Sequence, residues 1–199
     1  MKKNFLDLGR QPITNNFLSS IKKNKLKKEF FYNLKVFFNN KNNLVSLSKF
    51  VQPSKMFNDK YAHRASMSKT MLNSFKKLAD NLNKKYSPKK VLEIGSNDGV
   101  FIKHFKKIKN LGVEPCKNLA KITNKVGIKT YDEFWTNKTA KKIVRQNGKI
   151  DVIYSANTIS HIHNLNETFK AINYTLSDNG VFILEDPSLV EVLKNKSYD

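Results

Sequence analysis

The 199-residue chain contains one cysteine, Cys116, and only three arginines among its 37 basic residues. A single cysteine excludes a disulfide framework and a cysteine-rich zinc site. No apolar run approaches the roughly 20 residues of a membrane-spanning helix. The basic start at 1–7 has no apolar segment behind it, unlike a secretory signal. We therefore expect a cytoplasmic protein that contacts no membrane.

The net charge of +21 is unevenly distributed along the chain. Residues 1–90 hold 21 Lys and Arg against four Asp and Glu, whereas residues 91–199 hold 16 against 12. Such asymmetry is typical of proteins that bind nucleic acid or an anionic surface. Sites for phosphates and guanines, however, favour the planar guanidinium of arginine. Because nearly all the cations here are lysines, we expect mainly a solvated surface, with a polyanion partner as the lesser alternative.

The composition predicts two domains. Residues 1–60 contain Gly9, Pro12, Pro53 and the polar run 39–43, which favour irregular structure, with 30–38 and 44–51 as the candidate short strands. We predict a small irregular lobe over 1–60 and a second domain over 61–199. Over 66–86, apolar residues recur at three- and four-residue spacing, which predicts an amphipathic helix capped by Ser66 or Ser68 and ended by Ser87-Pro88.

After Pro88 the pattern alternates between strands and helices. The predicted strands are 91–94, 111–114, 128–131, 151–156 and 180–185, and the predicted helices are 100–108, 118–126, 137–146 and 165–176, with a turn at 177–180. This alternation predicts an α/β fold, in which helices cover both faces of a parallel sheet.

The loop after the first of these strands is the candidate ligand site. Gly95 and Gly99 allow a ligand to approach the backbone, and ligands of open parallel sheets bind beyond the carboxyl ends of the strands. A dinucleotide site would need a glycine at Asn97. Glu93 and Asp98 would repel a pyrophosphate, but they suit a cationic ligand without phosphate, such as S-adenosylmethionine.

A further carboxylate supports this interpretation. Glu114 ends the next strand, 19 residues after Gly95, where an acidic residue binds both ribose hydroxyls. The alternatives are a plain strand-to-helix turn for the glycines, a surface residue for Glu114, and a helix N-cap for Asp98. The predicted cofactor-binding residues are Glu93, Gly95, Ser96, Asn97, Asp98, Gly99, Glu114, Pro115, Phe134 and Asn157.

Two later segments carry the remaining candidates. In 132–135, an acidic residue and the aromatic Phe134 would suit an adenine, although core packing of Phe134 or Trp135 is as good an interpretation. In 155–163, polar residues follow a predicted strand. Asn157 would orient an acceptor and His161 would line the site or act as a base, with His163 the weaker candidate. No carboxylate and cysteine set completes a metal site.

These motifs together resemble the class I methyltransferases and, among them, the sugar C-methyltransferases that act on nucleotide-linked deoxysugars. The segments that carry the resemblance are Leu8–Phe17, Pro53–Phe57, Tyr61–Arg64, Ser66–Met71, Val91–Gly99, Gly112–Pro115, Asn157, His161-Ile162 and Gly180–Pro187. The resemblance implies a Rossmann-like central domain that binds S-adenosylmethionine, between an N-terminal zinc-binding lobe and a C-terminal sugar-binding domain.

The chain departs from the family pattern in its N-terminal lobe. One cysteine pair would precede Leu8 and the other falls near Asn39 and Asn42, so we expect no metal and a poorly ordered lobe. The position of an expected acceptor-site tyrosine is occupied by His63, with Tyr61 close by, and both are candidate catalytic residues.

The family's Glu-His segment, which supplies its proposed base, and the last two strands of its sheet would follow Asp199. We therefore expect a truncated sheet with an uncovered edge, and His161 or His63 in place of the base. The expected function is sugar C-methylation, weak or absent in this chain alone. The alternatives are an inactive cofactor-binding remnant, or a subunit completed by a second polypeptide. An RNA methyltransferase is less favoured, because no aromatic-basic binding module is evident.

Overall fold

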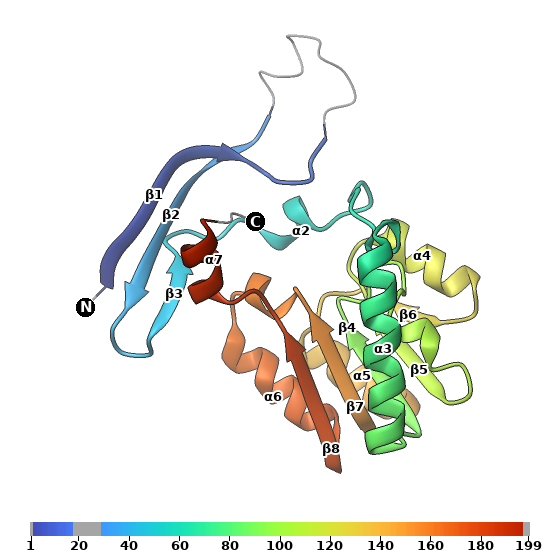
Figure 1. Cartoon of the computed structure of the whole chain (residues 1–199). Helices are drawn as coiled ribbons and strands as arrows, with labels where there is room; N and C mark the ends of the chain where they lie inside the picture. The colour runs from blue at the N-terminus through green and yellow to red at the C-terminus, as the bar shows by residue number, and fades with distance from the viewer. Residues whose placement is uncertain (1, 18–28, 197–199) are drawn as a thin grey trace. The chain divides into compact units, whose positions relative to one another are not determined.

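The structure is a computed structural model that describes residues 2–17 and 29–196 (Figure 1). The chain divides into two compact units, residues 1–63 and 64–199. Among the described residues, no helix is long and apolar enough to cross a membrane.

The first unit is built on an antiparallel sheet in the order β1-β2-β3. Its strands are β1 (Lys2–Pro12), β2 (Phe31–Asn39) and β3 (Leu44–Leu47), and the short helix α2 (Pro53–Met56) follows. The expectation of an irregular, poorly ordered lobe is therefore wrong. Gly9, with φ of +67°, lies at a register shift between β1 and β2, so a bulge accommodates the glycine without ending the strand.

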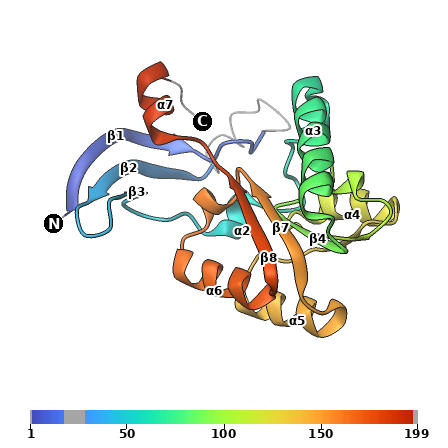
Figure 2. The same ribbon diagram turned by 60° about the horizontal axis from the view of Figure 1, so that its bottom comes forward.

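The second unit contains a parallel five-stranded sheet in the order β6-β5-β4-β7-β8, which confirms the predicted α/β fold (Figure 1). Figure 2 labels β4, β7 and β8 of this sheet in a second view. The strands are β4 (Lys90–Ile94), β5 (Lys109–Val113), β6 (Lys129–Tyr131), β7 (Ile150–Ala156) and β8 (Leu176–Glu185). Strand order reverses at β4, because β5 pairs on one side of it and β7 on the other. Ligand sites of such sheets lie at this switch point, beyond the carboxyl ends of the strands.

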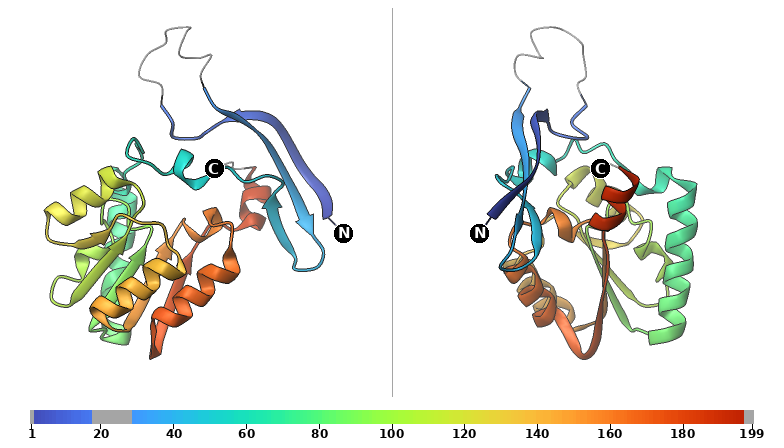
Figure 3. Two further views of the ribbon diagram at one scale, coloured as in Figure 1. Left: turned by 180° about the vertical axis from the view of Figure 1, so that it is seen from behind. Right: turned by 60° about the vertical axis from the view of Figure 1, so that its left-hand side comes forward.

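Helices cover both faces of this sheet (Figure 3). The α-helices are α3 (Lys69–Tyr86), α4 (Lys117–Lys125), α5 (Asn137–Asn147), α6 (Leu165–Thr175) and α7 (Leu189–Asn195), and the 3-10 helices are η1 (Ala65–Met67), η2 (Ile102–His104) and η3 (Ile159–His161). Residues of α5 and α6 pack with Leu92 and Ile94 in one core cluster, while α3 packs with Val91 and Tyr154 in the other. Ser68 caps α3, because its hydroxyl accepts the Met71 N–H at 3.3 Å.

Two sequence predictions in this unit are wrong. The helix expected at 100–108 is only the short 3-10 helix η2, where Phe101 and Ile102 are both fully buried. The ring of Phe101 packs on Tyr154 with centroids 4.1 Å apart. The turn expected at 177–180 lies inside β8, at a shift in its pairing with β7.

The residues of the N-terminal lobe do not fit a zinc ion. Structural zinc sites take four ligands, mostly cysteine and histidine, and residues 1–57 contain neither type. Within the described ranges, no group of three or more His, Cys, Asp or Glu is placed to hold a metal. Buried Ile13, Leu34 and Val51 supply the apolar interior of this unit instead, and Lys35 pairs with Asp7 at 2.7 Å on its surface.

We predict that the lobe folds without metal. Purified protein should contain no stoichiometric zinc by elemental mass spectrometry, and a chelator should leave its melting temperature unchanged. One equivalent of zinc, together with a lower melting temperature after chelation, would contradict this prediction.

Candidate functional site

The glycine loop 95–99 follows β4 at the switch point of the sheet. Gly95, Asn97 and Gly99 all have left-handed backbone angles, with φ of +74°, +48° and +80°. The amides of Gly95 and Ser96 donate to the carbonyl of Val113, at 2.8 and 3.1 Å. The loop is therefore a tight turn fixed to the end of β5.

Gly95 is needed because the segment after β7 packs against it. A Cβ at this position would lie 2.1 Å from Oγ1 of Thr158, which itself donates to the carbonyl of Ala156 at 2.9 Å. Thr158 was missed by the sequence analysis, because the contact joins residues 63 positions apart and no motif marks it. The contact brings the end of β7 against the glycine loop.

Glu114 is buried at the end of β5, with 5% of its surface exposed. Its Oε2 accepts the Asn97 N–H at 2.9 Å and its Oε1 accepts the Cys116 N–H at 2.8 Å. A carboxylate offers about four lone-pair sites, so capacity for further donors remains. Burial raises the pKa of Glu114 above its usual value, and these backbone donors act in the opposite direction.

Glu93 lies in β4 with 4% of its surface exposed, and its Oε2 accepts the Ile102 N–H at 3.2 Å. Burial raises its pKa well above the usual range, and the negative charges of Glu114 and Asp98 add to the effect. The hydrogen bond of Glu93 therefore holds the turn after the glycine loop. Glu93 would attract a cationic ligand only when its carboxyl group is ionised.

Asn97 and Asp98 hold the segment that leads into α3. Oδ1 of Asn97 accepts the Ala65 N–H at 3.0 Å, and Oδ1 of Asp98 accepts the Ser66 N–H at 3.3 Å. Asp98 therefore binds the start of η1, whereas the sequence analysis offered N-capping of its own following helix as the alternative. Between the two glycines, Ser96 is buried, and its hydroxyl has no hydrogen-bond partner among the described residues.

The two aromatic candidates in the segment after β6 have different environments. Trp135 is buried and its indole N–H donates to the Thr168 carbonyl at 3.3 Å, so it belongs to the core. Phe134 is 38% exposed and stays a candidate for an adenine contact. Beside it, Glu133 pairs with Lys142, which lowers the pKa of this carboxyl. Pro115, the last candidate here, is half-buried directly after Glu114.

The acceptor-site candidates of the second unit follow β7. Asn157 is exposed with φ of +47°, and its N–H donates to the Glu185 carbonyl at 2.7 Å. His161 ends η3 and is exposed, as is His163. The backbone N–H and hydroxyl of Ser160 both donate to the Asp186 carboxylate, at 3.2 and 3.1 Å. Asp186, which sequence analysis did not single out, thus fixes the turn that carries His161.

The other two catalytic candidates belong to the first unit. Tyr61 and His63 lie at its carboxyl end, with ring centroids 6.5 Å apart in an edge-on arrangement.

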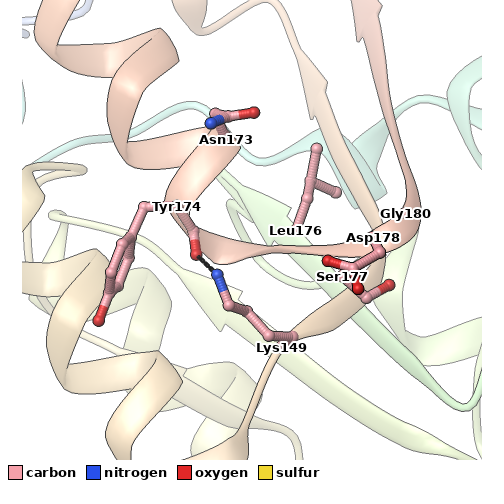
Figure 4. Close-up of a pocket in the computed structure, with 7 residues that line it drawn as sticks. All are labelled: Lys149, Asn173, Tyr174, Leu176, Ser177, Asp178 and Gly180. Atoms are coloured by element: carbon pink, nitrogen blue, oxygen red, sulfur yellow. Dashed lines mark hydrogen bonds between the residues drawn. The ribbon is translucent and has the colours of Figure 1, made fainter.

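One cavity of the second unit lies where β7 begins, at the end of the sheet opposite to the glycine loop 95–99 (Figure 4). It measures about 560 Å³ and is lined by Lys149, Asn173, Tyr174, Leu176, Ser177, Asp178 and Gly180. The ammonium of Lys149 donates to the carbonyl of Tyr174. The cavity is thus remote from the residues of the candidate site.

We predict that Gly95→Ala destabilises the protein more than Gly127→Ala. Both glycines have left-handed angles, φ +74° and +83°, but a Cβ at Gly127 meets nothing within 4 Å. The control should lose about 1–2 kcal/mol of unfolding free energy from backbone strain. Gly95→Ala should lose about 1–3 kcal/mol more from the clash with Thr158. Urea denaturation measures both, and equal losses would show that the Thr158 contact is unimportant.

Comparisons with known proteins address both units. A family model described as a methyltransferase domain matches residues 61–198. A second model, of a zinc binding domain, matches residues 1–57, the region that contains no cysteine or histidine. The C-methyltransferase NovU of Streptomyces niveus is 28% identical over 161 residues, which cover 78% of this chain and 38% of NovU. The chain thus spans about two fifths of the length of this relative.

Solved structures show the same fold. The plantazolicin methyltransferase BpumL, in complex with a monoazolic desmethylPZN analog and SAH, gives a TM-score of 0.53 at 14% identity, over 68% of this chain and 56% of that one. An S-adenosylmethionine-dependent methyltransferase from Clostridium acetobutylicum gives 0.52 at 16% identity, over 64% and 55%. With the family match over 61–198, these findings confirm the resemblance in the motifs: the chain belongs to the class I S-adenosylmethionine-dependent methyltransferases.

Proposed function

We propose that this chain binds S-adenosylmethionine between the glycine loop 95–99 and Glu114, and that it methylates carbon in a nucleotide-linked deoxysugar. The main support is the Glu114 carboxylate, which two backbone amides hold in place beside the loop. The ribose hydroxyls would donate to its remaining lone pairs, in charge-assisted hydrogen bonds. When bound, the cofactor supplies a methyl group on a sulfonium.

The surroundings of Glu114 suit this cofactor better than a dinucleotide. Burial and the nearby charge of Asp98 raise the pKa of Glu114, and burial with the charges of Glu114 and Asp98 raises the pKa of Glu93, so the three carboxyl groups lie near one another. Ionised carboxylates attract a sulfonium and an ammonium and repel a pyrophosphate. Gly95 and Gly99 adopt the left-handed angles of the tight turn along which the amino-acid part of the ligand would lie. Phe134 is exposed on the next loop and would contact the adenine.

A carbon acceptor is supported by the similarity to NovU, which is named a C-methyltransferase. The deoxysugar is supported by the ordered motifs that resemble sugar C-methyltransferases, such as Pro53–Phe57 and Tyr61–Arg64. A carbon beside a ketone must first lose a proton to become nucleophilic, which requires a general base. We propose His161 as this base and Asn157 as a group that orients the acceptor. Tyr61 and His63 are the further candidates.

The turn that carries His161 is held by the pair of hydrogen bonds from Ser160 to Asp186. Thr158, three residues before His161, packs on the glycine loop. The proposed base and the proposed cofactor loop therefore belong to one packed region, and holding donor and acceptor in line supplies much of the rate acceleration in such transfers.

We predict that the affinity for S-adenosylmethionine depends on the ionisation of Glu114. Its raised pKa means that protonation begins at a higher pH than for an ordinary carboxyl, so affinity should fall as the pH is lowered towards and below that raised pKa. Glu114→Gln should weaken binding about tenfold or more at neutral pH and lose most of the pH dependence. Any residual pH dependence would come from Glu93, whose pKa burial raises.

Calorimetric titrations between about pH 5 and 8, a range that lies above the usual carboxyl pKa, measure this effect. Glu191→Gln, an exposed carboxyl on α7, is the matched control and should bind normally. If Glu114→Gln binds as tightly as the unchanged chain, the assignment of the cofactor site is wrong.

We predict that His161→Ala abolishes proton removal from the acceptor, whereas His163→Ala retains it. The readout is deuterium exchange at the acidic carbon of a nucleotide-linked keto-deoxysugar, measured by NMR without cofactor, followed by formation of methylated product when S-adenosylmethionine is added. Exchange that persists in His161→Ala would contradict its role as base. If the unchanged chain binds the cofactor but supports no exchange, the alternative holds, in which it only binds cofactor or needs a second polypeptide.

A further inference from the structure

A second cavity lies within the first unit, and none of its lining residues belongs to the proposed cofactor site. It measures about 350 Å³ and is formed by the start of β2, the segment after β3 and the helix α2, which Figure 1 labels. Its lining residues are Phe30, Phe31, Tyr32, Asn33, Lys49, Phe50, Val51, Gln52 and Lys55. Pockets for small molecules are typically about 300–1,000 Å³ in volume.

Aromatic rings line this cavity and remain accessible to solvent. Phe30 and Phe31 are each 39% exposed and Phe50 is 51% exposed. Exposed aromatic surface that gathers around a concavity is typical of binding sites, whereas single exposed apolar residues need no explanation. A planar ring of a ligand stacks readily on such side chains, whatever the identity of the base.

The charges around the cavity have one sign. The ammonium of Lys55 lies 3.9 Å from the centroid of the Phe30 ring, and the guanidinium carbon of Arg10 lies 5.5 Å from that of Phe31. Lys49 also lines the cavity, and none of its lining residues is acidic. A lysine ammonium is a flexible point charge that binds phosphate well.

We propose that this aromatic-lysine pocket binds a nucleotide, with the base against the phenylalanine rings and the phosphates on Lys49 and Lys55. The combination favours a ligand that has a flat ring at one end and an anion at the other. A single nucleotide suits the size of the cavity better than a polynucleotide, which would need a longer basic track. No aromatic-basic module is evident from the sequence, because residues 30–33 and 49–55 come together only in the folded protein.

The proposal goes beyond the proposed function and does not depend on it. A nucleotide-linked acceptor would carry such a group, but the pocket would bind the nucleotide whether or not methyl transfer occurs. S-adenosylmethionine, which has an adenosine but no phosphate and is cationic, should not bind here.

The test is a calorimetric titration of the full chain with thymidine diphosphate, thymidine and inorganic diphosphate. Thymidine diphosphate should bind saturably, and each half alone should bind at least about tenfold more weakly, since stacking and charge pairing both contribute. Lys49→Gln and Lys55→Gln should each weaken binding several-fold, and so should Phe50→Leu, which keeps apolar bulk but removes the ring. Affinity for S-adenosylmethionine, measured on the same samples, should not change.

Lys41→Gln is the matched control, because it removes the same charge from the exposed turn between β2 and β3. It should leave thymidine diphosphate binding unaltered. Equal losses from Lys41→Gln and Lys49→Gln, or no saturable binding, would overturn the proposal. It would also be overturned if a ten-nucleotide single strand bound over a hundredfold more tightly than the mononucleotide, since that would indicate a surface for nucleic acid. If the same samples still bind S-adenosylmethionine, only the proposal of a nucleotide pocket fails, and the proposed function is unaffected.

Discussion

The candidate site depends on a buried carboxylate that joins two loops of the sheet. Glu114 directly follows β5, and its two oxygens accept the amides of Asn97 and Cys116. One amide belongs to the glycine loop after β4 and the other to the start of α4, so a single side chain sets the spacing between them. Burying a carboxylate is unfavourable unless hydrogen bonds compensate it, and the two backbone amides supply that compensation here.

Other contacts of the site extend outward from this centre. Glu93 fixes the turn that follows the glycine loop, and Asn97 and Asp98 fix the segment that precedes α3. Thr158 closes the loop from the side of β7. Three separate segments of the chain, around Ala65, Glu114 and Thr158, thus converge on 95–99. Such convergence preorganises the loop, and a preorganised site loses less conformational entropy when it binds its ligand.

The parallel sheet and the glycine loop could be predicted because their signals are local. Buried strands such as β4 and β7 are short, mainly apolar segments, and a glycine pair directly after a strand marks a tight turn. The sequence predictions that proved wrong concern residues whose conformation depends on contacts distant in the sequence. Residues 100–108 were predicted as a helix, but only η2 forms there, and the Phe101 ring packs inward on Tyr154. Gly9 was interpreted as a breaker, yet pairing with β2 turns it into a bulge within β1. Thr158 and Asp186 act through contacts that no local pattern reveals.

The structure of the chain with bound S-adenosylhomocysteine tests the central claim most directly. The account predicts that both ribose hydroxyls lie within hydrogen-bond distance of the Glu114 carboxylate and that the amino-acid part of the ligand lies along 95–99. A ligand bound elsewhere, or a ribose turned away from Glu114, would contradict it.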